Sequence, residues 1–269
     1  MRTTYDLRGQ DRPGLLVALH GLTGTRAQAD TYLAGWDHPE IGILAPDLRG
    51  HGDSPSLGEA EDFTPHELAG DVEALVRGLG LAGRRIHVLG VSLGATVALE
   101  LLRTATFDTG SAVFIRPSHG AGPAPHLRVN LRIADFLRDD PTTALDRLLA
   151  SDEYAAVARI SVRAAAGLRD KVTGPRAAER AMRLERGSTW TAFGADERVA
   201  TPAEALIVGT LDDPLHPLPV AVEWHLRIEG STMAVLPPRD GDPTAYAARM
   251  RETVQGFLSR AVATARAAS

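Results

Sequence analysis

The sequence predicts an α/β protein with a mostly parallel central sheet flanked by helices. Two observations carry this prediction. Apolar runs of strand length alternate with longer segments in which apolar residues recur at helical spacing. In addition, residues 85–102 have the pattern of a buried strand, a one-residue corner and a helix that begins at once. Strands that alternate with helices pair in parallel through right-handed crossovers, and the sites of such sheets lie beyond the carboxyl ends of the strands.

The predicted elements alternate on both sides of this corner. Before it, strands are expected at residues 3–7, 15–19 and 41–45, and helices at residues 26–36 and 65–79. The second of these helices has the clearest start, because Pro65 occupies the first helical position. After the corner helix, strands are expected at residues 112–115, 205–209 and 232–236, and helices from Leu218 and at residues 243–260.

The corner reads GVSLG at residues 90–94. Glycine is expected at positions 90 and 94 because a Cβ atom there would collide with the neighbouring strand or with the start of the helix. Ser92 would adopt a strained backbone conformation, which costs about 1–3 kcal/mol and is found mainly at functional sites. The following helix would direct free N–H groups, including that of Leu93, at an oxyanion formed above the serine. The motif predicts that Ser92 is a nucleophile.

Composition argues against several classes of function. The chain has 269 residues, 44% of them hydrophobic, which suffices for one core with room for an insertion. A net charge of −5 gives no electrostatic basis for binding nucleic acid or an anionic membrane surface. The absence of cysteine excludes disulfides and thiolate metal ligands. The polar N-terminus and the lack of a long apolar run predict a cytoplasmic protein.

Three motifs at matched strand ends resemble those of the α/β-hydrolase family. They are the HG pair at residues 20–21 after the first core strand, DLRGHGDS at residues 47–54 after the second, and GVSLG at residues 90–94. The resemblance is strong over residues 14–116 and weaker over residues 204–265. Three motifs in this order are specific, so the sequence is identified as a member of this family, with an α/β-hydrolase fold of about eight strands.

The resemblance also implies roles for individual residues. Ser92 would be the nucleophile, and the backbone N–H groups of Leu22 and Leu93 would form the oxyanion hole. His20 and Gly21 are assigned to substrate binding, with His20 packing its loop rather than acting as a general base. The family needs no cofactor, and no metal site is predicted. Within residues 47–54, Asp47 and Arg49 are expected to brace the loop by pairing with each other.

Residues 117–203 differ from the rest of the chain, because alanine, leucine and arginine dominate. Four amphipathic helices are expected there, at residues 130–137, 141–150, 153–168 and 175–186. The resemblance implies a helical cap over the active site, inserted between core segments 1–116 and 204–269; the alternative is a helical appendage packed elsewhere. A cap would exclude water and supply most substrate contacts. Its arginines are expected to form a solvated face, with recognition of an acidic substrate as the alternative.

The remaining catalytic groups are harder to assign. The family places its acid after the strand at residues 205–209, commonly before a proline, which assigns Asp213 and leaves Asp212 as the fallback. The family's histidine lies between the last strand and the last helix, where this chain has PPRDGD at residues 237–242 and no histidine after His225. A serine hydroxyl needs a base during attack, so this departure requires an explanation.

Three explanations remain open. A histidine of another loop could be the base, because triads depend on geometry rather than on chain position. His216 is the first candidate, in a proline-stiffened turn with Asp213. His119, at the end of the strand beside the corner strand, is the second. Alternatively, the protein could catalyse a proton transfer, elimination or cyclisation that forms no acyl-enzyme. As the third possibility, it could bind a ligand without catalysing a reaction.

The sequence therefore predicts a serine hydrolase with a displaced histidine that cleaves an ester, thioester or lactone of a small, mostly apolar metabolite. The alternatives are a non-hydrolytic cyclase or lyase and a catalytically inactive ligand-binding protein. We expect a small-molecule substrate as the partner, and neither cofactor, metal, nucleic acid nor membrane. The sequence offers no support for a homo-oligomer.

Overall fold

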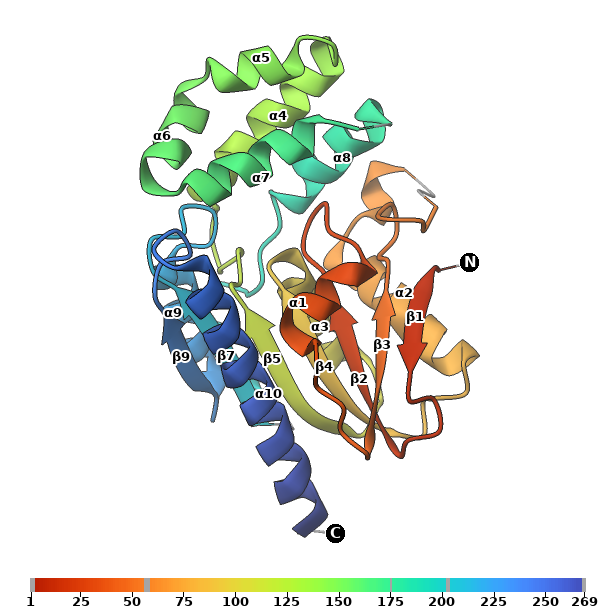
Figure 1. Cartoon of the computed structure of the whole chain (residues 1–269). Coiled ribbons are helices and arrows are strands. Elements are labelled where there is room, and N and C mark those ends of the chain that lie inside the picture. Colours follow the sequence, from red (N-terminus) through yellow and green to blue (C-terminus); the bar gives the residue numbers. More distant parts are fainter. Residues whose placement is uncertain (1–2, 56–58, 175, 202–203, 268–269) are drawn as a thin grey trace.

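The computed structural model describes residues 3–55, 59–174, 176–201 and 204–267. Its centre is a seven-stranded sheet in the order β1-β3-β2-β4-β5-β7-β9 (Figure 1), against the roughly eight strands that the resemblance implied. Neighbouring strands pair in parallel, except that β1 pairs antiparallel with β3. The strands are β1 (Tyr5–Arg8), β2 (Gly14–Leu19), β3 (Ile41–Pro46), β4 (Arg85–Val91), β5 (Thr109–Ile115), β7 (Glu204–Thr210) and β9 (Thr232–Leu236).

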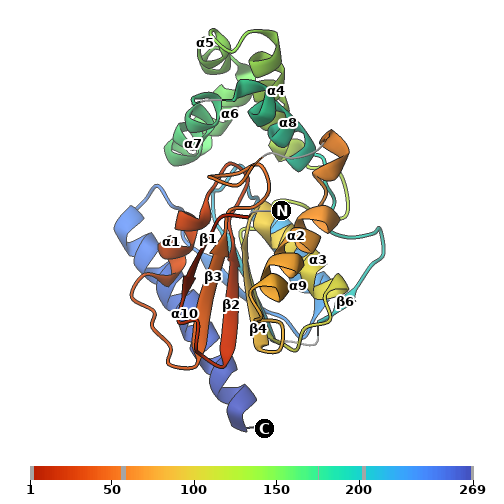
Figure 2. The same cartoon turned by 90° about the vertical axis from the view of Figure 1, so that its right-hand side faces the viewer.

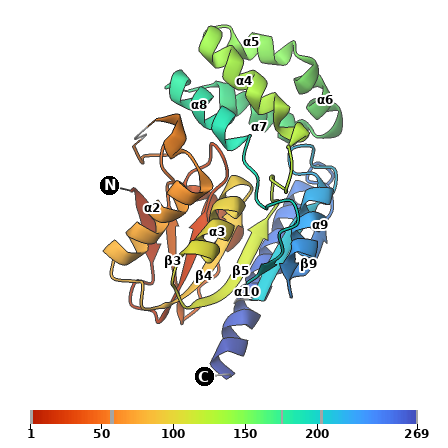
Figure 3. The ribbon, with the colours of Figure 1, turned by 180° about the vertical axis from the view of Figure 1, so that it is seen from behind.

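Helices cover both faces of this sheet, which confirms the predicted fold class. The side view and the rear view (Figures 2 and 3) show α1 and α10 on one face and α2, α3 and α9 on the other. Side chains of a strand alternate between faces, so Leu15 and Val17 of β2 pack on the second layer and Leu16 packs on the first. The core helices are α1 (Ala29–Leu33), α2 (Pro65–Gly78), α3 (Leu93–Thr104), α9 (Leu218–Arg227) and α10 (Pro243–Ala267).

Five further helices form a layer above one end of the sheet (Figure 1). They pack around an apolar cluster that includes Ile133, Leu148, Leu168 and Leu184, and Leu215 of the turn after β7 joins it. Helices α4 and α7 line a cavity together with Ser92, so this layer covers the carboxyl ends of the strands. The helices are α4 (Arg128–Asp139), α5 (Ala144–Leu149), α6 (Asp152–Ile160), α7 (Val162–Val172) and α8 (Ala177–Gly187).

Smaller elements complete the described chain. Two short strands pair with each other outside the main sheet, and three single turns of 3-10 helix precede longer helices. In the described ranges, every helix is too short or too polar to cross a membrane. The short elements are β6 (Val199–Ala200), β8 (Ile228–Glu229), η1 (Arg26–Gln28), η2 (Ala60–Asp62) and η3 (Pro125–Leu127).

Several predicted boundaries were wrong, and each has a local cause. The single helix expected at 153–168 is two helices, because Ser161 adopts an extended φ of −148° and its side chain caps α7 by accepting from the N–H of Ala164. The helix expected at 26–36 is a 3-10 turn followed by α1. The last helix continues past 260 to Ala267. The predicted helix start at residue 175 and the cap boundary at residue 203 lie outside the described residues.

The expected pair between Asp47 and Arg49 was also wrong. Asp47 is buried at the end of β3 and accepts from Arg26 of the neighbouring loop, both from its N–H and from its guanidinium. Arg49 instead points at α2 and forms a bidentate bond to Asp71, with both N–O distances 2.7 Å. The two side chains therefore tie their loop to two different elements rather than to each other.

The corner between β4 and α3 is the tightest backbone crossing of the core. Ser92 has φ 54° and ψ −114°, a region that side chains with a Cβ rarely adopt. A Cβ on Gly90 would lie 2.3 Å from the carbonyl oxygen of Gly94, and one on Gly94 would lie 2.5 Å from that of His20. Both contacts involve backbone atoms, which cannot move aside without shifting β2 or α3. The predicted steric need for both glycines is confirmed.

Gly94→Ala is therefore expected to lower the free energy of unfolding by more than about 2 kcal/mol, because the new methyl group would displace the end of β2. Gly70→Ala is the matched control. Gly70 lies exposed in the middle of α2 with no atom within 4 Å of the position of a Cβ. Its replacement should stabilise the protein by about 0.5–1 kcal/mol through the lower helix propensity of glycine. Urea denaturation checks both values, and equal effects would contradict the argument.

Candidate active site

One tight turn after β7 carries both an acid and an imidazole. The Oδ1 atom of Asp213 accepts the backbone N–H groups of Leu215 and His216, each at 3.1 Å, so the carboxylate closes the turn that follows it. Pro217 then starts α9 as its N-cap. The side chain of Asp213 is 3% exposed, whereas Asp212 is exposed and adopts a φ of 52°. The geometry thus favours Asp213 over the fallback residue Asp212.

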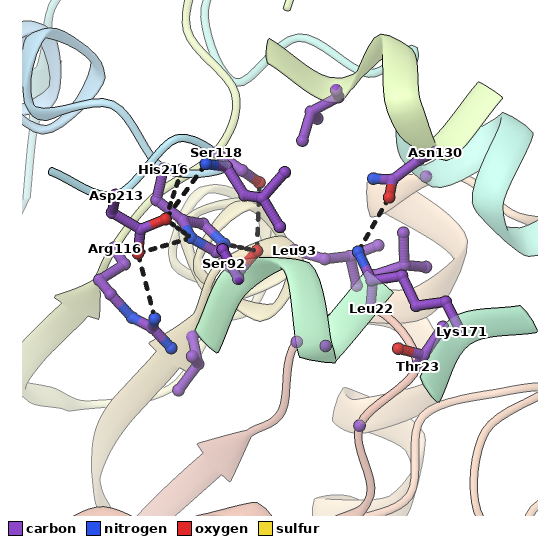
Figure 4. Close-up of a pocket in the computed structure, with 18 of the residues that line it drawn as sticks. Leu22, Thr23, Ser92, Leu93, Arg116, Ser118, Asn130, Lys171, Asp213 and His216 are labelled. Carbon is purple, nitrogen blue, oxygen red and sulfur yellow. Dashed lines mark hydrogen bonds and ion pairs between the residues drawn. The ribbon is translucent and has the colours of Figure 1, made fainter. Parts of the chain in front are cut away.

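This turn brings the imidazole to the serine of the corner. The Nε2 atom of His216 lies 2.9 Å from Ser92 Oγ, and its Nδ1 lies 3.1 Å from both carboxylate oxygens of Asp213 (Figure 4). An anionic carboxylate only accepts, so it fixes the tautomer in which Nδ1 carries the proton and Nε2 accepts from the Ser92 hydroxyl. The three side chains form the chain of hydrogen bonds that nucleophilic catalysis needs.

Neighbouring charges and burial set the protonation states of Asp213 and His216. Burial alone would raise the pKa of Asp213, but the charge and hydrogen bond of His216 and the guanidinium groups of Arg116 and Arg239 hold it well below its usual range. Desolvation lowers the pKa of His216 from its ordinary 6.5, and the attraction of Asp213 only partly opposes this shift. At neutral pH the acid is therefore ionised and the imidazole is neutral.

His119 has a different position from the one that a base requires. Its Nε2 lies 2.9 Å from the carbonyl oxygen of Gly187, and its Nδ1 lies within 3.2 Å of the hydroxyls of Thr96 and Ser118. Burial lowers the pKa of His119 to about 4. Both ring nitrogens are thus engaged away from Ser92, so the geometry favours His216. Ser118, which the sequence did not single out, lies between them, 3.4 Å from Ser92 Oγ.

Two backbone donors flank the serine. Leu93 begins α3, so its N–H has no acceptor within the helix, and Leu22 belongs to the loop that follows β2. Both residues line the cavity that Ser92 also lines, and Figure 4 shows them between Ser92 and Lys171. Neither N–H group is used in a hydrogen bond within the described residues. Both N–H groups are thus available, and the oxyanion hole stays a prediction.

The two residues assigned to substrate binding differ from each other. Gly21 lines the cavity, and its N–H donates to the side chain of Gln28 at 2.7 Å. The assignment of His20 to substrate binding was wrong, because its ring is 2% exposed and lies outside the cavity lining. Its Nε2 accepts the N–H of Leu48 and its Nδ1 lies 2.8 Å from the carbonyl oxygen of Gly21. This histidine packs its loop, as the sequence had also suggested.

The cavity has a volume of about 340 Å³ and lies between the strand ends and the helical layer. Its lining includes basic groups, whereas a mostly apolar substrate was expected. Lys171 and Arg163 come from α7, Arg116 follows β5 and Arg239 follows β9. The chain has a formal net charge of −5, so this local excess of cations is not a property of the whole chain.

A model of the "Alpha/beta hydrolase family" matches residues 16–255. The chain belongs to the α/β-hydrolase family. No curated protein sequence matches it significantly.

Solved structures of α/β hydrolases resemble it at low sequence identity. An α/β-hydrolase enzyme from a Medee basin deep-sea metagenome library superposes with a TM-score of 0.72 at 15% identity, covering 96% of this chain and 94% of that one. A thermophilic esterase from Thermogutta terrifontis gives 0.67 at 18% identity, covering 96% and 93%. A proline iminopeptidase-related protein from Thermus thermophilus gives 0.64 at 21% identity, covering 97% and 100%. At these identities the likeness concerns the fold.

The loop after β9 shows how this α/β hydrolase departs from the family pattern. Where the resemblance implies the histidine, Arg239 lines the cavity and lies over the ring of Tyr246, with its guanidinium 5.9 Å from the ring centroid. The imidazole comes instead from His216, after β7. Sequence reasoning missed Arg239 as a cavity residue, although its position in place of the histidine was a usable signal.

Arg116 was missed as well, and it holds the acid in place. It adopts a φ of 47° after β5, and its Nη1 lies 3.2 Å from Asp213 Oδ2, with both side chains almost fully buried. Arg116→Met should lower the free energy of unfolding by about 3–5 kcal/mol, because it leaves a buried carboxylate with one cation fewer. Arg8→Met is the control, since Arg8 forms an exposed pair with Asp30 and should change stability little. Similar losses in urea denaturation would contradict this account.

Proposed function

We propose that this α/β hydrolase is a serine hydrolase that cleaves an ester, thioester or lactone of a small molecule through an acyl-enzyme on Ser92. The observation that supports it best is the 2.9 Å contact between Ser92 Oγ and His216 Nε2, with Asp213 bonded behind the imidazole. A chain of this kind suits nucleophilic acyl transfer. Membership of a hydrolase family supports the same class of reaction.

In the first half-reaction, Ser92 Oγ attacks the carbonyl carbon and its proton passes to His216 Nε2. The electron pair of the carbonyl bond moves to oxygen, and the N–H groups of Leu22 and Leu93 would stabilise that oxyanion. The intermediate collapses as the bond to the leaving alcohol or thiol breaks, and the leaving atom takes the proton from Nε2. Asp213 stabilises the imidazolium that forms between these two transfers.

In the second half-reaction, a water molecule gives a proton to His216 Nε2 and its oxygen attacks the acyl carbon. The bond to Ser92 Oγ then breaks, and the serine recovers its proton from the imidazole. The product acid leaves and the protein returns to its starting state. The helical layer above the cavity would act as the predicted cap, limiting water to what this step needs.

Substitution of the two reacting side chains is the first test. Ser92→Ala and His216→Ala should each lower kcat for 4-nitrophenyl esters by a factor on the order of 10⁴ or more, because each removes a group that the attack requires. His66→Ala on α2 is the control, since His66 is exposed and bonded to Glu100. A fluorophosphonate probe should label the native protein at Ser92 and leave Ser92→Ala unlabelled.

The same test separates the alternatives. If native protein neither reacts with the probe nor turns over any ester, the hydrolase proposal fails and a cyclase, lyase or ligand-binding role gains support. If His216→Ala keeps full turnover while His119→Ala loses it, the assignment of the base is wrong. Thermal melting of each variant shows whether a loss reflects unfolding instead.

The pH dependence is the second test. His216 must be neutral to accept the serine proton, and its pKa lies below 6.5 because of desolvation. With an uncharged ester, kcat/KM should rise with pH through an inflection below pH 6.5 and then remain level at neutral pH. The active form is the deprotonated one, so activity is lost as pH falls through that pKa. An inflection above pH 7 would contradict a desolvated imidazole as the base.

A further inference from the structure

The chain contains one lysine, Lys171, and it lies in this cavity. On α7, Ala164 and Gly167 line the cavity with it at helical spacing. These two small residues leave room below the helix, and the long side chain of Lys171 extends into that room. In Figure 4, Lys171 lies on the far side of Leu22 and Leu93 from the Asp213–His216 pair. Its ammonium thus lies in the compartment that Ser92 shares.

The hydrogen bonds around this lysine orient it without neutralising it. The Nζ atom donates to Asn130 Oδ1 at 2.9 Å, and the amide of Asn130 is held by its donation to Ser188 Oγ at 3.1 Å. Asn130 is 1% exposed, so its amide is a fixed part of the cavity wall. An ammonium has three donors, and this is its only hydrogen bond among the described residues. The others are available to a ligand.

Charge balance distinguishes Lys171 from two of the three arginines that line the same cavity; the third, Arg239, lies over the ring of Tyr246. Arg116 is paired with Asp213, and Arg163 lies 3.9 Å from Asp240. Lys171 forms no ion pair within the described residues; the neighbouring Asp170 is exposed, although it lines the same cavity. Removal from water lowers the pKa of Lys171 to about 8, and the attraction of Asp213, which also lines the cavity, opposes this shift only partly.

We infer that Lys171, held by Asn130, is a substrate-recognition site for a carboxylate, so that the substrate is an ester, thioester or lactone that also carries an acidic group. This inference rests on the proposed function and replaces the apolar substrate with an anionic one. A carboxylate would accept the free N–H groups of Lys171 and balance its charge. Pairing in a partly desolvated cavity discriminates strongly against a neutral ligand, which would leave the cation unpaired.

Matched esters test this site. The substrates are 4-nitrophenyl hemiesters of dicarboxylic acids from succinate to suberate, each compared with the ester in which a neutral carboxamide replaces the free carboxylate. At the best chain length, native protein should favour the acid over its amide by about 10- to 100-fold in kcat/KM, mainly through KM. Lys171→Met should abolish this ratio, and Lys171→Arg should restore part of it.

Two further variants separate recognition from a structural role. Asn130→Asp keeps the lysine and supplies an internal counter-ion, so it should reduce the preference for the acid. Arg169→Met removes an exposed cation of the same helix that does not line the cavity, and should leave the preference unchanged. Equal acid-to-amide ratios in native protein at every chain length, or a Lys171→Met variant that keeps the ratio, would overturn the inference.

Binding of adipate, measured by calorimetry, makes the test independent of turnover. Native protein and Ser92→Ala should both bind it, and Lys171→Met should bind about tenfold more weakly or worse. Adipate binding without ester hydrolysis would sustain the anion site while the hydrolase proposal fails. Hydrolysis of neutral esters without adipate binding would support the hydrolase proposal and overturn the anion site. Similar affinity in native protein and Lys171→Met would contradict the inference, provided that both melt at similar temperatures.

Discussion

The close approach of α3 to the end of β2 is the constraint on which the rest of the site depends. Gly94 packs directly on the carbonyl groups of Leu19 and His20, and Gly90 packs on the first turn of α3. Between these two contacts the chain turns at Ser92, which adopts a φ of 54°. Strain of this kind persists only when the surrounding structure over-determines it. The buried strands on either side of β4 supply that rigidity, and the hydroxyl of Ser92 is presented at the sheet edge as a result.

In the proposed mechanism, the base and the acid lie in the same turn, after β7. Asp213 accepts the backbone N–H groups that close the turn as well as the ring Nδ1 of His216, so one carboxylate shapes the loop and orients the imidazole. With both side chains in one turn, the loop after β9 does not have to be positioned relative to the loop after β7 for the acid and the imidazole to meet. This arrangement also leaves the loop after β9 without an imidazole, and Arg239 adds its positive charge to the field that keeps Asp213 ionised.

The helical layer gives the cavity its chemical character. The strand-end loops contribute Ser92, His216 and the backbone donors, whereas α4 and α7 contribute the Asn130–Lys171 pair. The layer packs around an apolar cluster that Leu215 and Leu22 of the strand-end loops join, so its helices are held against the carboxyl edge of the sheet. Under the two proposals, the groups that act on the bond and those that recognise the rest of the substrate come from different parts of the chain. The helical layer can therefore give this protein its own substrate selectivity on a fold that many hydrolases share.

The sequence by itself determined the order of elements and the parallel sheet and predicted Ser92 as the nucleophile, because hydrophobic periodicity and the steric demands of GVSLG are local properties of the chain. The resemblance to the family assigned Asp213, and His216 was predicted because it lies in the same short turn, whose stiffness can be judged from its prolines. Only the tertiary structure decided between His216 and His119, because the distance to Ser92 depends on how three strand ends converge. The partners of Asp47 and Arg49, the roles of Arg116 and Arg239, and the cationic cavity likewise depend on contacts between residues far apart in the chain. Periodicity indicates which face of a helix is polar, but not which charge on it faces the serine.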